Sequence, residues 1–122
     1  MVRVLTVDDQ PHFREAARAL VGVTPGFEVV AESASGESAL GVAEEVRPDV
    51  VLLDARMPGM DGLETARRLS ADDPSRVIAL VSSADLAPLA GEAAASGVAA
   101  VLRKQWLTPR LLRGLWIAHR RR

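Results

Sequence analysis

The chain has 122 residues, 48% of them apolar, which fits one domain with one hydrophobic core. Its 15 basic and 16 acidic side chains almost cancel, which excludes both a strongly basic nucleic-acid-binding body and an acidic disordered tail. Because cysteine is absent, disulfides, thiolate zinc sites and cysteine nucleophiles are excluded.

Five short apolar runs alternate along the chain with stretches of helical periodicity. The runs are β-branched and nearly continuous in apolar residues, which is typical of parallel strands covered on both faces. The predicted strand and helix pairs are, in chain order, Val2–Val7 and Pro11–Val21, Phe27–Ala31 and Gly36–Val46, Asp49–Leu53 and Leu63–Ser70, Val77–Val81 and Leu86–Ser96, and Ala99–Leu102 and Pro109–His119. We therefore predict an α/β fold, a (βα)5 doubly wound five-stranded parallel sheet, as one domain over residues 1–122.

Local signals mark the starts of three of these helices. Ser35 is placed to cap the second helix, and Asp61 with Glu64 three residues later forms a variant of the capping box. Thr108 followed by Pro109 supplies an N-cap and an N1 proline to the last helix. The fourth helix is rich in alanine and lacks large side chains, so we expect it to have few buried contacts, low local stability and some mobility.

The sequence shows neither a signal peptide nor a membrane span. The N-terminal residues MVRVLTVDD carry one cation before an apolar run that ends in two aspartates, a pattern unlike a signal peptide. No stretch approaches the roughly 18 apolar residues that a membrane span needs. We therefore expect a cytoplasmic protein without a membrane partner.

Chemically active side chains follow four of the five predicted strands. Asp8 and Asp9 end the first strand, Asp54 the third, Ser82 the fourth and Lys104 the fifth. The carboxyl ends of parallel strands meet at one edge of the sheet, so these side chains should converge. One such aspartate could simply be a solvated loop residue or a helix cap. Neither explanation accounts well for three aspartates at the same edge. Clustered carboxylates require a cation, and all-oxygen ligands favour Mg²⁺ or Mn²⁺.

Asp54 is the candidate nucleophile of this cluster. Carboxylates attack phosphorus to form an aspartyl phosphate, and the four apolar residues before Asp54 predict a buried, fixed position. A metal between Asp54 and the Asp8–Asp9 pair would neutralise charge on the transferred phosphoryl group. Lys104, the only lysine among 15 cations, would cancel more of that charge, and Ser82 would donate its hydroxyl to a phosphoryl oxygen.

The sequence resembles the receiver domains of two-component response regulators over essentially all 122 residues. The matching segments are VLTVDDQPHFRE, RPDVVLLDARMPGMDGLE, RVIALVSSAD and GVAAVLRK, of which DARMPGMDG is the most specific. The opening and middle segments are most similar to the NarL-type subgroup. The resemblance implies a flavodoxin-like (CheY-like) fold and a phosphorylated switch, not an enzyme that turns over an external substrate.

The resemblance also implies roles for individual positions. Asp54 corresponds to the phosphoacceptor that a sensor histidine kinase phosphorylates. The remaining implied site comprises Asp8, Asp9 and the backbone carbonyl of Arg56 as further Mg²⁺ ligands, Ser82 as the switch hydroxyl, and Lys104. The family also implies a homodimer or effector contact through the fourth helix, fifth strand and fifth helix, where Trp106 is the candidate contact. No nucleic-acid contact by this chain itself is implied.

Three positions depart from the family pattern, one of them Ser83, where a small apolar residue is more usual after the switch hydroxyl. Val101 stands where the family often has an aromatic residue, and the chain has no tyrosine, so an aromatic rotamer switch at this position is excluded. Gln105 stands where a cis-proline commonly follows the lysine. Whether the Lys104–Gln105 bond is cis is open, since a cis bond costs a non-proline pair about 2.5–4 kcal/mol.

Two other functions are less favoured but remain open. A degenerate receiver would bind a partner without phosphorylation, and a small-molecule phosphohydrolase would use an aspartate nucleophile. Such hydrolases usually carry DxDx[TV] after the first strand, whereas this strand ends in DDQP. The output is also open: the chain is either the receiver of a transcription regulator or a stand-alone receiver, and the ending LLRGLWIAHRRR, without a linker-like run, favours the latter.

Overall fold

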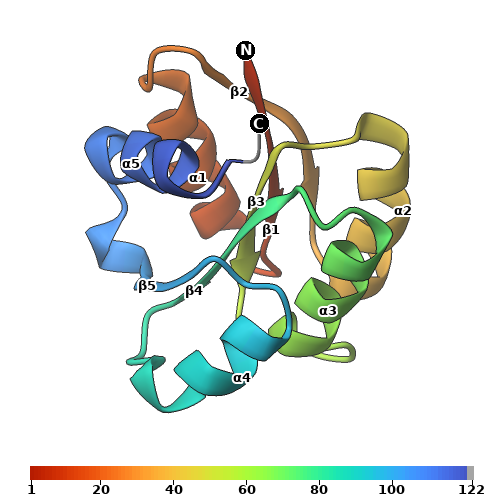
Figure 1. Ribbon diagram of the computed structural model, residues 1–122. Coiled ribbons are helices and arrows are strands. Elements are labelled where there is room, and N and C mark those ends of the chain that lie inside the picture. The colour runs from red at the N-terminus through yellow and green to blue at the C-terminus, as the bar shows by residue number, and fades with distance from the viewer. Residues whose placement is uncertain (121–122) are drawn as a thin grey trace.

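A five-stranded parallel sheet forms the centre of the computed structural model, which describes residues 1–120. The elements are β1 (Val2–Val7), α1 (Pro11–Gly22), β2 (Phe27–Ser33), α2 (Gly36–Val46), β3 (Val50–Asp54), α3 (Gly62–Asp72), β4 (Val77–Ser82), the 3₁₀ turn η1 (Ala87–Leu89), α4 (Ala90–Ala95), β5 (Ala100–Arg103), the 3₁₀ turn η2 (Lys104–Trp106) and α5 (Pro109–His119). The strand order is β2-β1-β3-β4-β5, with α1 and α5 on one face and α2 and α3 on the other (Figure 1). The predicted doubly wound (βα)5 fold is confirmed.

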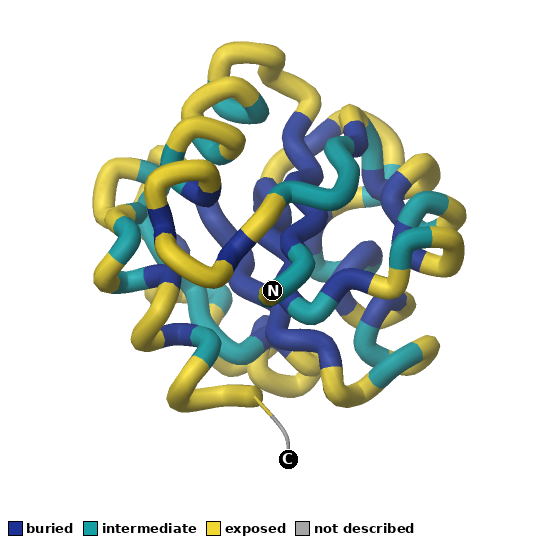
Figure 2. Tube along the Cα trace, turned by 90° about the horizontal axis from the view of Figure 1, so that it is seen from above, coloured by how far each residue is buried: buried dark blue, intermediate teal, exposed yellow. Residues whose placement is uncertain are grey.

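The central strands are buried on both faces. Every residue of β3 and of β4 is buried, and Figure 2 shows the buried chain at the centre within an exposed rim of helices. Because successive side chains of a strand point to opposite faces, β1 supplies Leu5 to the core under α2 and α3 and Val4 to the core under α1 and α5. Leu112 and Leu115 of α5 complete the second core. This two-sided burial explains the continuous apolar runs of the sequence.

The three predicted N-caps are confirmed, but the capping box is only half formed, because the Glu64 carboxylate accepts from Arg67 and Arg68. The side chains of Ser35, Asp61 and Thr108 each accept a hydrogen bond from the backbone N–H three residues later, at 2.9–3.1 Å. Each bond satisfies an N–H that has no partner within its helix. The caps fix where α2, α3 and α5 begin and therefore where the preceding loops run over the carboxyl edge of the sheet.

The prediction of one helix over Leu86–Ser96 is wrong. The segment divides into the turn η1 and a helix α4 of six residues, Ala90–Ala95. Pro88 lacks a backbone N–H and sits in the first turn, which closes as a 3₁₀ turn through a 2.9 Å bond from Leu89 N–H to the Leu86 carbonyl. Gly97, with a φ of +84°, ends the helix on its other side.

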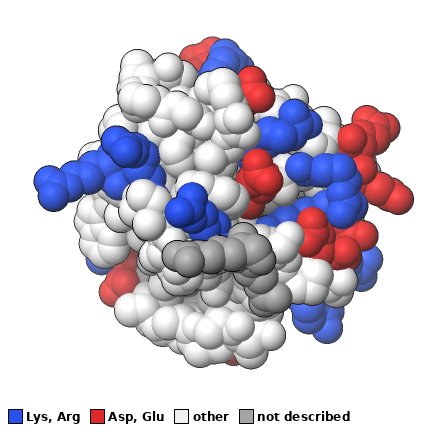
Figure 3. Space-filling view, turned by 45° about the horizontal axis from the view of Figure 1, so that its top comes forward, with Lys and Arg blue, Asp and Glu red and all other residues white. Residues whose placement is uncertain are grey.

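Other features bear on the site and the surface. No peptide bond among residues 1–120 is cis, so the Lys104–Gln105 bond is trans. None of the helices described has the length and apolarity needed to cross a membrane. On the face shown in Figure 3, basic side chains are intermixed with acidic ones along one side, in keeping with the net charge of −1.

Candidate functional site

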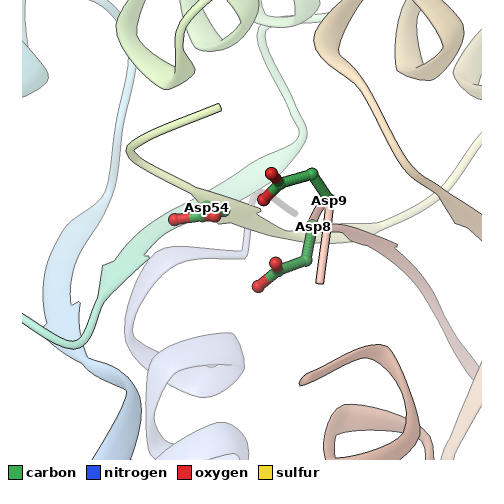
Figure 4. A group of neighbouring side chains, drawn as sticks. All are labelled: Asp8, Asp9 and Asp54. Atoms are coloured by element: carbon green, nitrogen blue, oxygen red, sulfur yellow. The ribbon is translucent and has the colours of Figure 1, made fainter. Parts of the chain in front are cut away.

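The ends of β1 and β3 bring three aspartates together. Asp8, Asp9 and Asp54 each offer a carboxylate oxygen, and these oxygens lie within 4.8 Å of one another (Figure 4). Asp8 and Asp54 are buried, whereas Asp9 is exposed. Because β1 and β3 are adjacent parallel strands, their carboxyl ends share one edge of the sheet. The structure therefore gathers the carboxylates that the sequence predicted to converge.

Lys104 lies between the two buried aspartates. Its Nζ is 2.6 Å from Asp8 Oδ2 and 3.7 Å from Asp54 Oδ2, and only 7% of its side chain is exposed. The residue opens the turn η2 directly after β5, so the trans bond to Gln105 does not prevent it from reaching the cluster. The ammonium also lies 3.5 Å from the centre of the Phe13 ring, a cation–π contact.

Asp54 is held by the backbone around it. Its Oδ1 accepts a 3.2 Å hydrogen bond from the Arg56 N–H, which places the main chain of Arg56 against the carboxylate. Burial raises the pKa of Asp54 above its usual value, while the Arg56 N–H lowers it. The charge of Asp8 raises this pKa further, the charge of Lys104 lowers it, and Asp9 adds a smaller rise. The carboxylate is thus poorly solvated, and an added cation would stabilise it.

The start of α1 fixes Asp8. Its Oδ1 accepts a 2.9 Å hydrogen bond from the Gln10 N–H, and its backbone carbonyl accepts a 2.6 Å bond from the Arg14 guanidinium. Asp8 Oδ2 is left facing Lys104. Asp8 is therefore oriented by its own loop and helix, whereas Asp9, at the same strand end, is exposed to solvent at the rim of the cluster.

Ser82 is buried at the end of β4, on the same edge of the sheet. Its Oγ accepts a 3.1 Å hydrogen bond from the Ala84 N–H of the following loop. Because the oxygen accepts this bond, the hydroxyl proton is free to donate to another group. The neighbouring strands are tied by a 2.8 Å bond from the Ala55 N–H to the Val81 carbonyl, which fixes the Ser82 strand end beside Asp54.

Three contributors were missed by the sequence reasoning. Phe13 lies under the Lys104 ammonium, and Arg14 binds the Asp8 carbonyl. Glu37 of α2 accepts a 2.7 Å bond from the Met60 N–H and so holds the loop after Asp54. The first two lie in the opening turn of α1, and their position just after the strand end was the available signal. Glu37 gave no signal, because its partner is distant in the sequence.

The donor set fits a divalent cation. Three carboxylates with one ammonium leave a net charge of −2, and every candidate ligand atom is an oxygen. Hard divalent cations such as Mg²⁺ take carboxylate and carbonyl oxygens and retain several waters. The exposed position of Asp9 leaves one side of the cluster open to solvent. The arrangement can hold such a cation beside a buried carboxylate that acts as a nucleophile.

Comparisons with known proteins agree with this geometry. Residues 4–115 match the response regulator receiver domain family. The chain is 36% identical to the response regulator GacA of Pseudomonas viridiflava over 104 residues, which cover 85% of this chain and 49% of that protein. The curated relatives that it matches are longer, and the matched region spans between 20% and 49% of their length.

Solved structures show the same likeness. The signal receiver domain of the response regulator NarL from Mycobacterium tuberculosis superposes with a TM-score of 0.86 and 31% identity, over 97% of this chain and 95% of that one. A LuxR-family two-component response regulator from Aurantimonas sp. SI85-9A1 gives a TM-score of 0.87 and 29% identity, over 97% of this chain and 86% of that one.

Fold and acidic edge together define a signalling module of the flavodoxin-like α/β class. The chain belongs to the response regulator receiver domain family of two-component systems. Receiver domains interact with histidine kinases, and relatives of this chain include transcription regulators such as NarL and GacA.

Proposed function

We propose that Asp54 accepts a phosphoryl group from a phosphohistidine of a sensor kinase in a Mg²⁺-dependent step. A carboxylate oxygen of Asp54 bonds to phosphorus, the phosphorus–nitrogen bond to the kinase breaks, and the electron pair of that bond stays on the histidine. The observation that carries this proposal is a buried, poorly solvated carboxylate beside two further carboxylates and one ammonium.

Four groups would hold the cation in this proposal. They are the carboxylates of Asp8, Asp9 and Asp54 and the backbone carbonyl of Arg56. When bound, Mg²⁺ neutralises negative charge on the phosphoryl oxygens. Asp8 is held by the Gln10 N–H and Asp54 by the Arg56 N–H, so these two ligands are oriented before any cation arrives. Such preorganisation lowers the cost of binding.

Lys104 and Ser82 would bind the phosphoryl oxygens. The Lys104 ammonium is already 3.7 Å from Asp54 Oδ2, and a small rotation of its side chain would transfer it from Asp8 to a phosphoryl oxygen. Ser82 retains a free hydroxyl proton for another oxygen. Both groups are buried and come from the two strands beyond β3, so their movement would pass to the loops that follow β4 and β5.

The output would be a change in the α4–β5–α5 face. A phosphoryl group adds about −1.5 to −2 charge, enough to reposition a short loop. The helix α4 contributes only Ala93 as a fully buried side chain, so little packing holds it in place. Trp106 is 54% exposed beside Arg103, whose guanidinium lies 5.6 Å from its ring centre. We infer that a second copy or an effector covers this tryptophan.

Phosphorylation by a small phosphodonor tests the proposal. Acetyl phosphate with Mg²⁺ should place one acid-labile phosphate on each wild-type chain and none on Asp54→Asn. The matched control is Asp85→Asn, which removes an exposed carboxylate of the loop after β4 and should be labelled like the wild type. An unlabelled wild type would contradict the proposal and would favour a phosphorylation-independent receiver.

Turnover separates a switch from a hydrolase. We expect at most autophosphorylation and slow autodephosphorylation of Asp54, with no sustained hydrolysis of small phosphate esters. A steady-state assay that releases many phosphates per chain would instead assign the site to a phosphohydrolase.

A further inference from the structure

A contact between α2 and the loop after Asp54 joins two segments that are far apart in the chain. Residues 55–61, which connect β3 to α3, are called the acceptor loop below. Oε1 of Glu37, in the first turn of α2, accepts a 2.7 Å hydrogen bond from the Met60 N–H of this loop. The same N–H is the main reason why the pKa of Glu37 lies below its usual value. Glu37 is therefore charged at neutral pH, and the hydrogen bond is charge-assisted.

Two glycines allow the close approach of α2 to the acceptor loop. Gly59 has a φ of +78°, and a Cβ on it would lie 2.7 Å from Glu37 Oε1 and would displace that carboxylate. A Cβ on Gly36 would lie 2.9 Å from the Met60 carbonyl oxygen. The contact thus depends on small residues on both sides, one in the helix and one in the loop.

Few other hydrogen bonds hold the acceptor loop. Its two ends are tied to each other, because the Gly62 N–H donates to the Ala55 carbonyl at 3.2 Å. Among the backbone groups of residues 57–60, the Met60 N–H alone is hydrogen-bonded within residues 1–120. Glu37 is therefore the polar side chain that fixes the main chain between the two ends of the loop.

A stiff segment connects the Glu37 contact to Arg56. Pro58 has a fixed φ, and a residue before proline is restricted as well, so Met57 and Pro58 turn together. Gly59, the next residue, is a flexible joint. Without the Glu37 bond, rotation at this joint would let the stiff segment tilt and would turn the Arg56 carbonyl that precedes it. The Met57 side chain is buried and limits this tilt, so the carbonyl would lose its alignment only in part.

We propose that Glu37 is a positioning residue that strengthens Mg²⁺ binding by orienting the Arg56 carbonyl. Glu37 lies outside the cluster of three aspartates, and its Oε1 is already bonded to the Met60 N–H, so it acts through the acceptor loop and not as a ligand. This inference rests on the proposed function, to which the cation and its carbonyl ligand belong. A carboxylate on the surface of α2 thereby sets how much Mg²⁺ the site needs.

Hydrogen exchange in the metal-free protein measures the contact itself. The Met60 amide should exchange at least about tenfold faster in Glu37→Ala than in the wild type, because its acceptor is lost. Glu37→Gln keeps an acceptor oxygen and should stay within about threefold of the wild type. The control is Glu45→Ala, which removes an exposed carboxylate from the last turn of the same helix and should leave the exchange of Met60 unchanged.

Calorimetric titration with Mg²⁺ measures the consequence of the contact. The Kd should rise about three- to tenfold in Glu37→Ala, the value of one hydrogen bond, and should change less than about twofold in Glu37→Gln and Glu45→Ala. Phosphorylation of Asp54 by acetyl phosphate should divide in the same way. In Glu37→Ala the Mg²⁺ concentration for half-maximal rate should rise, while the rate at saturating Mg²⁺ stays within about twofold. A general loss of structure would lower the saturated rate as well.

Three results would overturn the role of Glu37. Wild-type Mg²⁺ affinity in Glu37→Ala would remove it and leave the proposed function intact. Equal weakening of Mg²⁺ binding by Glu37→Gln and Glu37→Ala would show that the charge of the side chain matters and not its hydrogen bond to Met60. A wild-type protein that binds no Mg²⁺ would overturn the proposed function together with this inference, and that result precedes any variant.

Discussion

Lys104 and Asp8 form a buried ion pair, with Nζ 2.6 Å from Oδ2 and less than a tenth of either side chain exposed. The pair connects the end of β5 to the end of β1, across the two strands between them. Breaking one member of such a pair leaves a buried charge without compensation. The ammonium therefore stays within the acidic cluster unless another cation or a phosphoryl group replaces its partner.

Replacing Lys104 by arginine should preserve the fold and impair phosphorylation. The planar guanidinium is wider than an ammonium and cannot occupy the same point between Asp8 and Asp54 above the Phe13 ring. We expect the rate of Asp54 phosphorylation by acetyl phosphate to fall at least about tenfold, or ~1.4 kcal/mol of barrier. Arg110→Lys on the exposed side of α5 is the control and should react normally. Wild-type rates for Lys104→Arg would show that only the charge matters.

Asp54→Asn should stabilise the protein at neutral pH. Burial raises the folded-state pKa of Asp54, so the folded state binds more protons than the unfolded state between the usual value of about 3.9 and the raised value. The free energy of unfolding therefore falls as the pH rises through that window and Asp54 ionises. Asparagine does not ionise, so the variant keeps the stability that the wild type loses. The melting temperature of Asp54→Asn should exceed that of the wild type at pH 7 by a few degrees.

The same comparison at lower pH is the internal control for Asp54. Below about pH 3.9 the wild-type carboxyl is protonated in both states, so the two melting temperatures should converge. Mg²⁺ at pH 7 should raise the melting temperature of the wild type more than that of Asp54→Asn. A variant that is less stable than the wild type at pH 7 would contradict this account.

Gly62 is required for the close approach of α3 to Asp54. A Cβ at this position would lie 2.6 Å from the Asp54 carbonyl oxygen and 2.7 Å from the Ala55 Cα, neither of which can move without shifting β3. Gly62→Ala should destabilise the protein by about 1–3 kcal/mol in urea unfolding and slow Asp54 phosphorylation. The control is Gly41→Ala, an exposed position of α2 with open space, which should be stabilising by up to about 1 kcal/mol.

Arg76 ties two helices together at the opposite edge of the sheet. Its side chain is 1% exposed and donates to the Leu69 carbonyl of α3 at 3.1 Å and the Ala43 carbonyl of α2 at 3.3 Å. Arg76→Ala should cost about 2–4 kcal/mol in urea unfolding, because both carbonyls would lose a buried donor. The same substitution should not change the fraction of folded chains that become phosphorylated. Arg113→Ala, at an exposed position, should be near neutral.

Local sequence was sufficient for most of the fold. Apolar runs over β1, β3 and β4 and caps at Ser35, Asp61 and Thr108 predicted elements that the structure confirms. The segment after β4 was the exception, because alanines satisfy a helical pattern at any length and helical spacing does not distinguish an α-helical turn from a 3₁₀ turn. Periodicity reports which residues are buried and says less about where a weak helix begins.

The sequence by itself determined which residues stand at the carboxyl ends of the strands, and therefore that three aspartates, a serine and the single lysine share one edge. It determined this because strand direction and the βα alternation are local properties. Only the tertiary structure decided that Lys104 pairs with Asp8 more closely than with Asp54, and that Phe13 underlies the ammonium. These relationships depend on how β5 and α1 pack against the sheet, and packing distances between segments far apart in the chain leave no trace in local pattern.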